Sequence, residues 1–117
     1  MTLRELDHSV IEFDAGPEHA NPMGTLHGGV FCDLADAAMG TAWVTGLKDG
    51  ETCTTIELKI NFFRPVWSGR LIADGRVLRR GKSVGYVECE LRDTEGRLVA
   101  KASSTLMTLR GDPAAGR

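Results

Sequence analysis

Two glycines and one acid, close together at a predicted helix, are the strongest candidates for chemistry in this sequence. Gly28 and Gly29 open a segment whose apolar residues recur at helical spacing. The first turn of a helix has unpaired N–H groups and a partial positive charge, so it can polarise a carbonyl oxygen or stabilise an oxyanion. A glycine-rich turn that only lets the helix begin explains the same residues, so both interpretations stay open.

The acid is Asp36, about two helical turns after Gly28. A carboxylate in a tight, partly dry groove acts as a nucleophile or as a general base. Spacing alone favours an ordinary exposed acid, and Asp33, one turn away, competes for the role. An intrahelical salt bridge is excluded because the residues at helical spacing from Asp36 carry no positive charge: Cys32, Asp33, Met39 and Gly40.

A sheet must hold this helix in place. Apolar spacing predicts the helix from Gly28 to about Val44, and alternation or turn signals predict strands at 9–13, 55–62, 71–78, 84–91 and 98–109. Short turns imply antiparallel neighbours, and the helix must bury its apolar stripe on one sheet face. The sequence therefore predicts an α+β domain with a curled antiparallel sheet of five to six strands around one long central helix.

Length, charge and composition narrow the class of protein. The 117 residues predict a single domain, 1–117, with a disordered tail at 110–117. The net charge of −2 argues against nucleic-acid binding, and no apolar run approaches the ~20 residues that span a membrane. Three separated cysteines without metal-ligand spacing predict reduced thiols, a cytoplasmic protein and no metal site: Cys32, Cys53 and Cys89.

The blocks around the glycines and the acid resemble a known family. The similarity is to PaaI-type hotdog-fold thioesterases, carried by Asn21-Pro22-Met23-Gly24-Thr25-Leu26-His27-Gly28-Gly29 and Leu34-Ala35-Asp36. It extends through residues 55–65 and 79–83 and covers the chain from about Val10 to Leu109. The resemblance implies a hotdog fold and hydrolysis of an acyl-CoA thioester with an aryl or medium-chain acyl group. CoA is then part of the substrate, and no separate cofactor is expected.

The resemblance also implies a role for each matching residue. Asp36 occupies the position of the catalytic carboxylate, and Gly28 that of the glycine whose N–H polarises the thioester carbonyl. Asn21 matches a polar residue that orients the nucleophile or water, from the other subunit. Thr55 falls where a hydroxyl assists the water in some members, although the adjacent Thr54 stays open as an alternative.

Subunits of this family pair edge to edge, so the resemblance implies a homodimer, with dimers associating into a tetramer and active sites at the dimer interface. CoA carries phosphates, and the densest cationic run is a candidate to bind them at a hairpin turn. A solvated, charged turn explains that run without a ligand. The expected substrate- and CoA-binding residues are His27, Gly29, Arg64, Arg79, Arg80, Gly81, Lys82 and Ser83.

Two other functions remain open on this fold. A non-catalytic acyl-CoA-binding protein would use the same pocket without turnover. Some hotdog proteins are dehydratases that place a histidine with the acid on the catalytic helix, but no histidine lies between Gly28 and Val44. Ser103 and Ser104 lack the nucleophile-elbow pattern, which counts against a Ser-His-Asp hydrolase.

Overall fold

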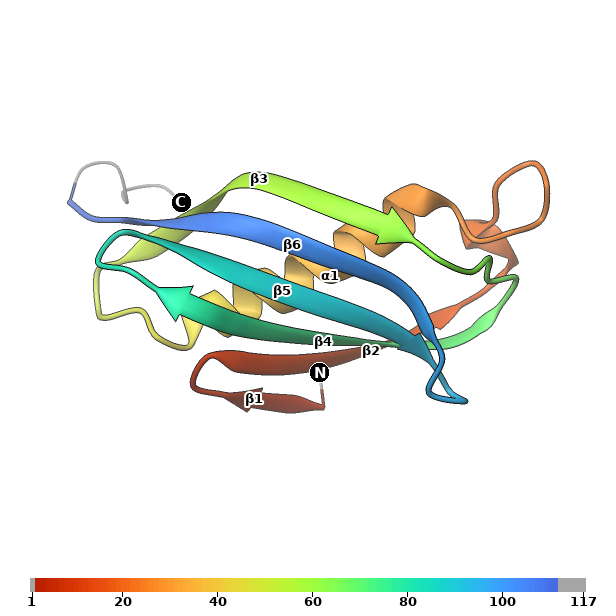
Figure 1. Cartoon of the computed structure of the whole chain (residues 1–117), viewed down its shortest axis with the longest axis horizontal. Coiled ribbons are helices and arrows are strands. Elements are labelled where there is room, and N and C mark those ends of the chain that lie inside the picture. The colour runs from red at the N-terminus through yellow and green to blue at the C-terminus, as the bar shows by residue number, and fades with distance from the viewer. Residues whose placement is uncertain (1, 112–117) are drawn as a thin grey trace.

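The computed structural model describes residues 2–111, which form a curved antiparallel sheet around one long helix (Figure 1). The helix is α1 (Gly28–Val44), with the bounds predicted from the sequence. The strands are β1 (Leu3–Glu5), β2 (His8–Ala15), β3 (Thr52–Phe62), β4 (Gly69–Arg80), β5 (Val84–Asp93) and β6 (Leu98–Leu109). The predicted α+β hotdog arrangement is confirmed. Residues 112–117 of the predicted tail lie outside the described residues.

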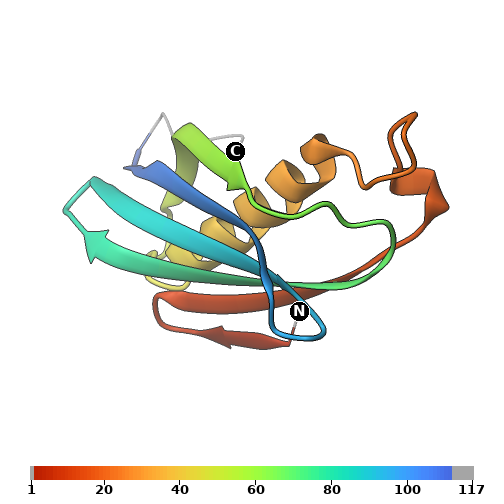
Figure 2. The ribbon, with the colours of Figure 1, turned by 45° about the vertical axis from the view of Figure 1, so that its right-hand side comes forward.

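The sheet runs in the order β1-β2-β4-β5-β6-β3, so β1 and β3 are its two edges. Figure 2 shows the strands curving past one side of α1, which leaves the opposite side of the helix uncovered by sheet. The strand β1 and the 3-10 helix η1 (Pro17–His19) were not among the predicted elements. β1 has only three residues and forms through pairing with β2, so its own pattern carries little signal.

The apolar stripe of α1 is buried against the sheet as predicted. Its buried members are Phe31, Leu34, Ala35, Ala38, Met39, Ala42 and Trp43. Trp43 is fully buried, and its Nε1–H donates to Thr108 Oγ1 at 3.0 Å, which satisfies the polar atom of that ring. On the opposite face, Asp33, Asp36 and Ala37 are exposed. The stripe therefore sets which residues of the helix a ligand can reach.

The backbones of the helix and the sheet lie close together at Ala38. Ser9 Oγ, buried on β2, donates to the Ala38 carbonyl at 2.7 Å. Beside it on β4 is Gly75, where an added Cβ would lie 2.6 Å from the same carbonyl oxygen. A glycine is needed there because any side chain would push the helix away from the sheet.

A β-bulge in β3 changes which side chains face the helix. The register with β6 shifts between Thr55 and Glu57, so Ile56 is the extra residue. A regular alternation over the predicted strand at 55–62 turns Ile56 inward with Leu58, and this expectation is wrong, because the Ile56 side chain is 52% exposed. Thr55 pairs with the buried Leu106, and opposite residues share a sheet face, so Thr55 is the hydroxyl that faces the helix.

Replacing Gly75 with alanine tests the close approach. We expect Gly75→Ala to lower the free energy of unfolding by about 2 kcal/mol, since the methyl group overlaps the Ala38 carbonyl. Gly40 is the matched control, because an added Cβ there meets nothing within 4 Å. Gly40→Ala should raise stability by about 0.5–1 kcal/mol through helix propensity. Urea denaturation followed by tryptophan fluorescence measures both, and equal shifts would contradict the interpretation.

Candidate active site

The acid and the hydroxyl of the predicted site meet on the uncovered side of α1. Thr55 Oγ1 donates a hydrogen bond to Asp36 Oδ1 at 3.1 Å. The hydroxyl holds one carboxylate oxygen in place and leaves Oδ2 available. Within residues 2–111, no basic side chain forms an ion pair with Asp36. Asp36 is therefore an oriented, unneutralised carboxylate.

A groove of about 340 Å³ lies beside this pair. It crosses the small residues of the outer helix face, and its lining is Arg4, Asp36, Ala37, Gly40, Thr41, Val44 and Cys53. Burial raises the pKa of the Cys53 thiol, the charge of Asp36 adds to that rise, and Arg80 opposes it. The thiol is accordingly neutral near pH 7 and a poor nucleophile. Asp36 is left as the reactive group of this groove.

The competing acid, Asp33, faces a different part of the surface. It lies at a separate, mostly apolar pocket formed with Phe13, His19, Val30, Leu34 and Ala37. His19 takes part in the adjoining loop, where its Nδ1 accepts a hydrogen bond from the Gly16 N–H at 3.1 Å. Within residues 2–111, no hydroxyl group forms a hydrogen bond with Asp33, which distinguishes this acid from Asp36.

The start of α1 forms the second part of the site. His27 is the N-cap, and its Nδ1 accepts a hydrogen bond from the Gly29 N–H at 3.0 Å. Among the described residues, the Gly28 N–H has no hydrogen-bond partner. An added Cβ at Gly28 would lie 3.3 Å from Phe62 Cζ, so a side chain there would crowd that ring. Gly28 thus presents an open N–H donor at a helix N-terminus.

An apolar pocket of about 340 Å³ opens at this donor. Its lining comes from the loop before α1, the first helical turns and the end of β3: Thr25, Leu26, Gly28, Phe31, Phe62, Phe63, Arg64 and Pro65. The Phe31 and Phe62 rings pack edge to face with their centroids 5.6 Å apart. The pocket can therefore hold an apolar chain or ring next to a hydrogen-bond donor.

Within one chain, the N–H donor at Gly28 and the carboxylate of Asp36 lie far apart. Gly28 and Asp36 are separated by eight residues of helix, which corresponds to about 12 Å along its axis. A single thioester group is too small to contact both in the same chain. Asn21 belongs with Gly28, since it lies in the loop that leads into the helix, where its Nδ2 donates to Thr25 Oγ1 at 2.9 Å. Each chain thus carries two half-sites.

The cationic run of the β4–β5 hairpin is split by a second bulge. The register shifts between Val77 and Arg79, which turns Arg80 toward the helix and leaves Arg79 exposed. Arg80 donates to Asp7 Oδ1 at 2.7 and 3.0 Å and to the Trp43 carbonyl at 2.9 Å. Its guanidinium carbon lies 4.1 Å from the Trp43 ring centroid. We therefore leave Arg80 out of the proposed nucleotide site.

The other residues of the hairpin also differ in whether they are available to a ligand. Gly81 shapes the turn, because an added Cβ would lie 2.3 Å from the Val84 carbonyl oxygen. Ser83 Oγ accepts a hydrogen bond from Arg110 Nη1 at 2.9 Å, so it already has a partner. Arg79 and Lys82 are exposed and form no ion pair within residues 2–111. These two cations are the ones available to a phosphate.

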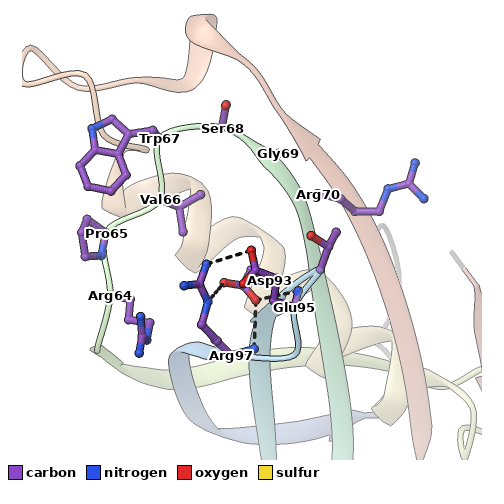
Figure 3. Close-up of a pocket in the computed structure, with 11 residues that line it drawn as sticks. Arg64, Pro65, Val66, Trp67, Ser68, Gly69, Arg70, Asp93, Glu95 and Arg97 are labelled. Atoms are coloured by element: carbon purple, nitrogen blue, oxygen red, sulfur yellow. Dashed lines mark hydrogen bonds and ion pairs between the residues drawn. The ribbon is translucent and has the colours of Figure 1, made fainter.

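Arg64 lies at the other end of the molecule. It lines the apolar pocket at Gly28 and a further pocket of about 320 Å³ that Figure 3 shows. In that pocket Arg97 pairs with Asp93 at 2.7 Å. Partial desolvation raises the pKa of Asp93, but the N–H groups and the guanidinium of Arg97 outweigh it and hold the pKa below its ordinary value. In the part of the chain that the structure describes, Arg64 forms no ion pair, so its charge is available to a ligand at this end.

A comparison with known protein families identifies the family of this chain. Residues 23–100 match the family model described as the thioesterase superfamily. The chain belongs to the thioesterase superfamily. The matched region runs from the loop before α1 to the start of β6 and includes Gly28, Asp36 and Thr55. Among residues 2–111, no helix is long and apolar enough to cross a membrane.

Curated relatives of this thioesterase-superfamily chain carry the names of esterases and thioesterases. A protein of Saccharolobus solfataricus named "Putative esterase" is 38% identical over 91% of this chain and 75% of its own length. Acyl-coenzyme A thioesterase 13 of Homo sapiens is 26% identical over 82% of this chain and 69% of its own length. A Caenorhabditis elegans protein, also named "Putative esterase", is 31% identical over 89% of this chain and 62% of its own length.

Solved structures of the superfamily share the fold. The PaaI protein of the E. coli phenylacetic acid degradation operon superposes with a TM-score of 0.85 at 24% identity, over 92% of this chain and 76% of that chain. A Bacillus halodurans protein crystallised with CoA has a TM-score of 0.82 at 30% identity, over 86% of this chain and 66% of that chain. The PaaI-type resemblance seen in the sequence is thereby confirmed.

Adjacent arginines at the hairpin should differ sharply in their effect on stability. We expect Arg80→Gln to lower the free energy of unfolding by about 2 kcal/mol, because it removes the bonds to Asp7 and to the helix carbonyl. Arg79→Gln is the matched control and should stay within about 0.5 kcal/mol of the wild type. Urea denaturation measures both variants. A neutral Arg80→Gln would show that the guanidinium does not hold the helix end.

Proposed function

We propose that this protein hydrolyses acyl-CoA thioesters with Asp36 as the catalytic carboxylate. The observation that carries the proposal is the hydrogen bond from Thr55 Oγ1 to Asp36 Oδ1, 3.1 Å long, beside an open groove. It orients a carboxylate that forms no ion pair with the basic side chains of residues 2–111. Membership of the thioesterase superfamily supports the same reaction. The predicted cytoplasmic location stays a prediction.

The chemistry follows from the two groups. As a general base, Asp36 takes a proton from water while the water oxygen attacks the thioester carbon; as a nucleophile, it attacks that carbon itself and water then cleaves the acyl-enzyme. In both routes the carbonyl oxygen gains negative charge, which the Gly28 N–H and the helix N-terminus stabilise. The C–S bond breaks and the sulfur takes up a proton, so a free acid and CoA are the products.

A homodimer would join the two half-sites. β3 is an edge strand, and its outer backbone groups are available to pair with a second copy. A two-fold, antiparallel pairing of β3 with itself, centred between Leu58 and Lys59, lays Phe62 of one strand beside Thr55 of the other. Because Gly28 packs next to Phe62, the pairing would bring Gly28 of the partner subunit toward Asp36. Association of such dimers into a tetramer stays a prediction.

The same pairing suggests where CoA would bind. Arg64 lies beyond the end of β3, whereas Arg79 and Lys82 lie at the opposite end of the molecule, near the end of α1 (Figure 1). An antiparallel dimer places the hairpin of one subunit toward the Arg64 end of the other. We infer that these cations bind the CoA phosphates, a ligand that the Bacillus halodurans relative holds. The apolar lining at Phe31 and Phe62 suits an aryl or medium-chain substrate.

Removing the charge of Asp36 tests its role directly. We expect Asp36→Asn to lower kcat at least about 100-fold with little change in KM, since the amide can neither accept the proton nor attack the thioester. Asp33→Asn is the matched control, because Asp33 faces a different pocket, and it should retain near wild-type turnover. A thiol-release assay with hexanoyl-CoA and benzoyl-CoA measures both variants.

Undiminished turnover in Asp36→Asn would overturn the assignment of the acid. Thermal stabilisation of the wild type by acyl-CoA without any release of thiol would instead show a non-catalytic binding protein on this fold.

Mixing two inactive variants tests whether the site is shared between subunits. Gly28→Pro removes the N–H, yet proline suits the first helical position, and His27 already has the extended backbone that precedes proline (φ −64°, ψ 134°). Gly28→Ala keeps the donor and adds the same Cβ, so it should remain active. Mixed dimers of Gly28→Pro and Asp36→Asn contain one intact site.

Co-refolding of these two variants should restore about a quarter of the wild-type rate, because about half of randomly assorted dimers are mixed and each holds one working site. The thiol-release assay and the mass of the complex by analytical ultracentrifugation provide the readouts. A mixture no more active than its separate components would place both groups in one chain and contradict the shared site.

A further inference from the structure

Arg4 reaches the helix side of the sheet although it lies on the short edge strand β1. Across successive strands, Arg4 pairs with Ser9, Ser9 with Gly75, and Gly75 with Cys89. Ser9, Gly75 and Cys89 are buried and face α1, and Ser9 contacts the helix through its bond to Ala38. Opposite residues share a sheet face, so Arg4 continues this row beyond the edge, alongside the helix.

The groove beside Asp36 therefore has opposite charges on its two flanks. Asp36 and Cys53 lie at the β3 side, and Arg4 lies at the β1 side of the same groove. Between them the helix presents the small surfaces of Ala37 and Gly40. A groove with an acid at one end, a cation at the other and a small, neutral floor can hold an extended chain across the helix.

Arg4 is one of the few arginines without an acidic partner. Within residues 2–111, ion pairs engage Arg70, Arg76, Arg80, Arg92, Arg97 and Arg110. The three that remain are Arg4, Arg64 and Arg79, and the last two are at the ends proposed for CoA. Asp36 is more than an ion-pair distance from Arg4, since no contact within 4.0 Å joins them. The Arg4 charge is thus available to a ligand in the groove.

We propose that Arg4 is a specificity-determining residue that favours acyl groups ending in a carboxylate. This inference rests on the proposed thioesterase function and names its substrate class, the thioesters of dicarboxylic acids. With the thioester carbon at Asp36, an acyl chain that ends in a carboxylate crosses the small helix face instead of entering the apolar pocket at Phe31 and Phe62. Its terminal carboxylate then meets the guanidinium, whose planar N–H groups match a carboxylate.

The width of the helix sets the preferred length. An α-helix with its side chains is about 10 Å across, which corresponds to a chain of roughly six carbons plus the contact to the guanidinium. A shorter diacid would hold its second carboxylate nearer to Asp36, where like charges repel. Arg4 should therefore favour six-carbon diacids over both a neutral acyl group of equal length and a three-carbon diacid.

Hexanedioyl-CoA and hexanoyl-CoA form the matched substrate pair, because they differ only in the terminal carboxylate. We expect the wild type to prefer hexanedioyl-CoA in kcat/KM. Arg4→Gln should lower the ratio of the two kcat/KM values about fivefold, and Arg4→Lys should retain part of the preference. Arg76→Gln, on the outer sheet face with its own partner Asp74, is the control and should leave the ratio unchanged.

The outcomes separate this inference from the function on which it rests. If neither thioester releases thiol, the proposed function fails. If hexanoyl-CoA is hydrolysed but Arg4→Gln leaves the ratio as in the wild type, the role of Arg4 is overturned while the hydrolase stands. A fall in the ratio that 0.5 M salt reproduces in the wild type supports a charge contact, since salt screens exposed pairs.

Discussion

The close contact of α1 with the sheet at Ala38 is the constraint on which the rest of this structure depends. Ser9 anchors the Ala38 carbonyl from β2, and Gly75 leaves no side chain to hold the helix off. With the helix seated there, its apolar stripe is covered and its small, acidic face is exposed along the open side of the sheet. Thr55 reaches Asp36 only because helix and strand lie at this separation.

Two β-bulges then decide which of two neighbouring side chains faces the helix. In β3 the extra residue, Ile56, turns Thr55 toward the helix. Without the bulge, side chains would alternate regularly back from the inward-facing Leu58, and Thr54 would face the helix instead. In β4 the bulge turns Arg80 onto Trp43 and leaves its neighbour Arg79 exposed. One inserted residue exchanges the faces of every residue beyond it, so a bulge can separate a structural role from a functional role at adjacent positions.

Helix geometry also explains why the proposed site would need two chains. The donor at Gly28 and the acid at Asp36 share a helix, and the rise per residue separates them by about 12 Å. Each half-site lies beside β3, one near its end and one near its middle. The edge strand β3 flanks both half-sites. Pairing two copies along β3 would therefore bring the Gly28 half-site of one subunit toward the Asp36 half-site of the other.

The sequence by itself determined the elements with strong periodicity and the identity of the chemical groups. The bounds of α1, the five longer strands and an α+β class with a curled sheet around one helix follow from apolar spacing and turn residues. The hotdog class and the roles expected of Asp36 and Gly28 followed from the resemblance to a known family, because spacing alone favoured an ordinary exposed acid at Asp36. Only the tertiary structure shows that Thr55 contacts Asp36, that Asp33 faces another pocket, and that Arg80 is paired whereas Arg79 is exposed. It also brought Arg4 into the groove. The physical reason is that bulges and edge pairing depend on contacts between distant segments, which local patterns do not record.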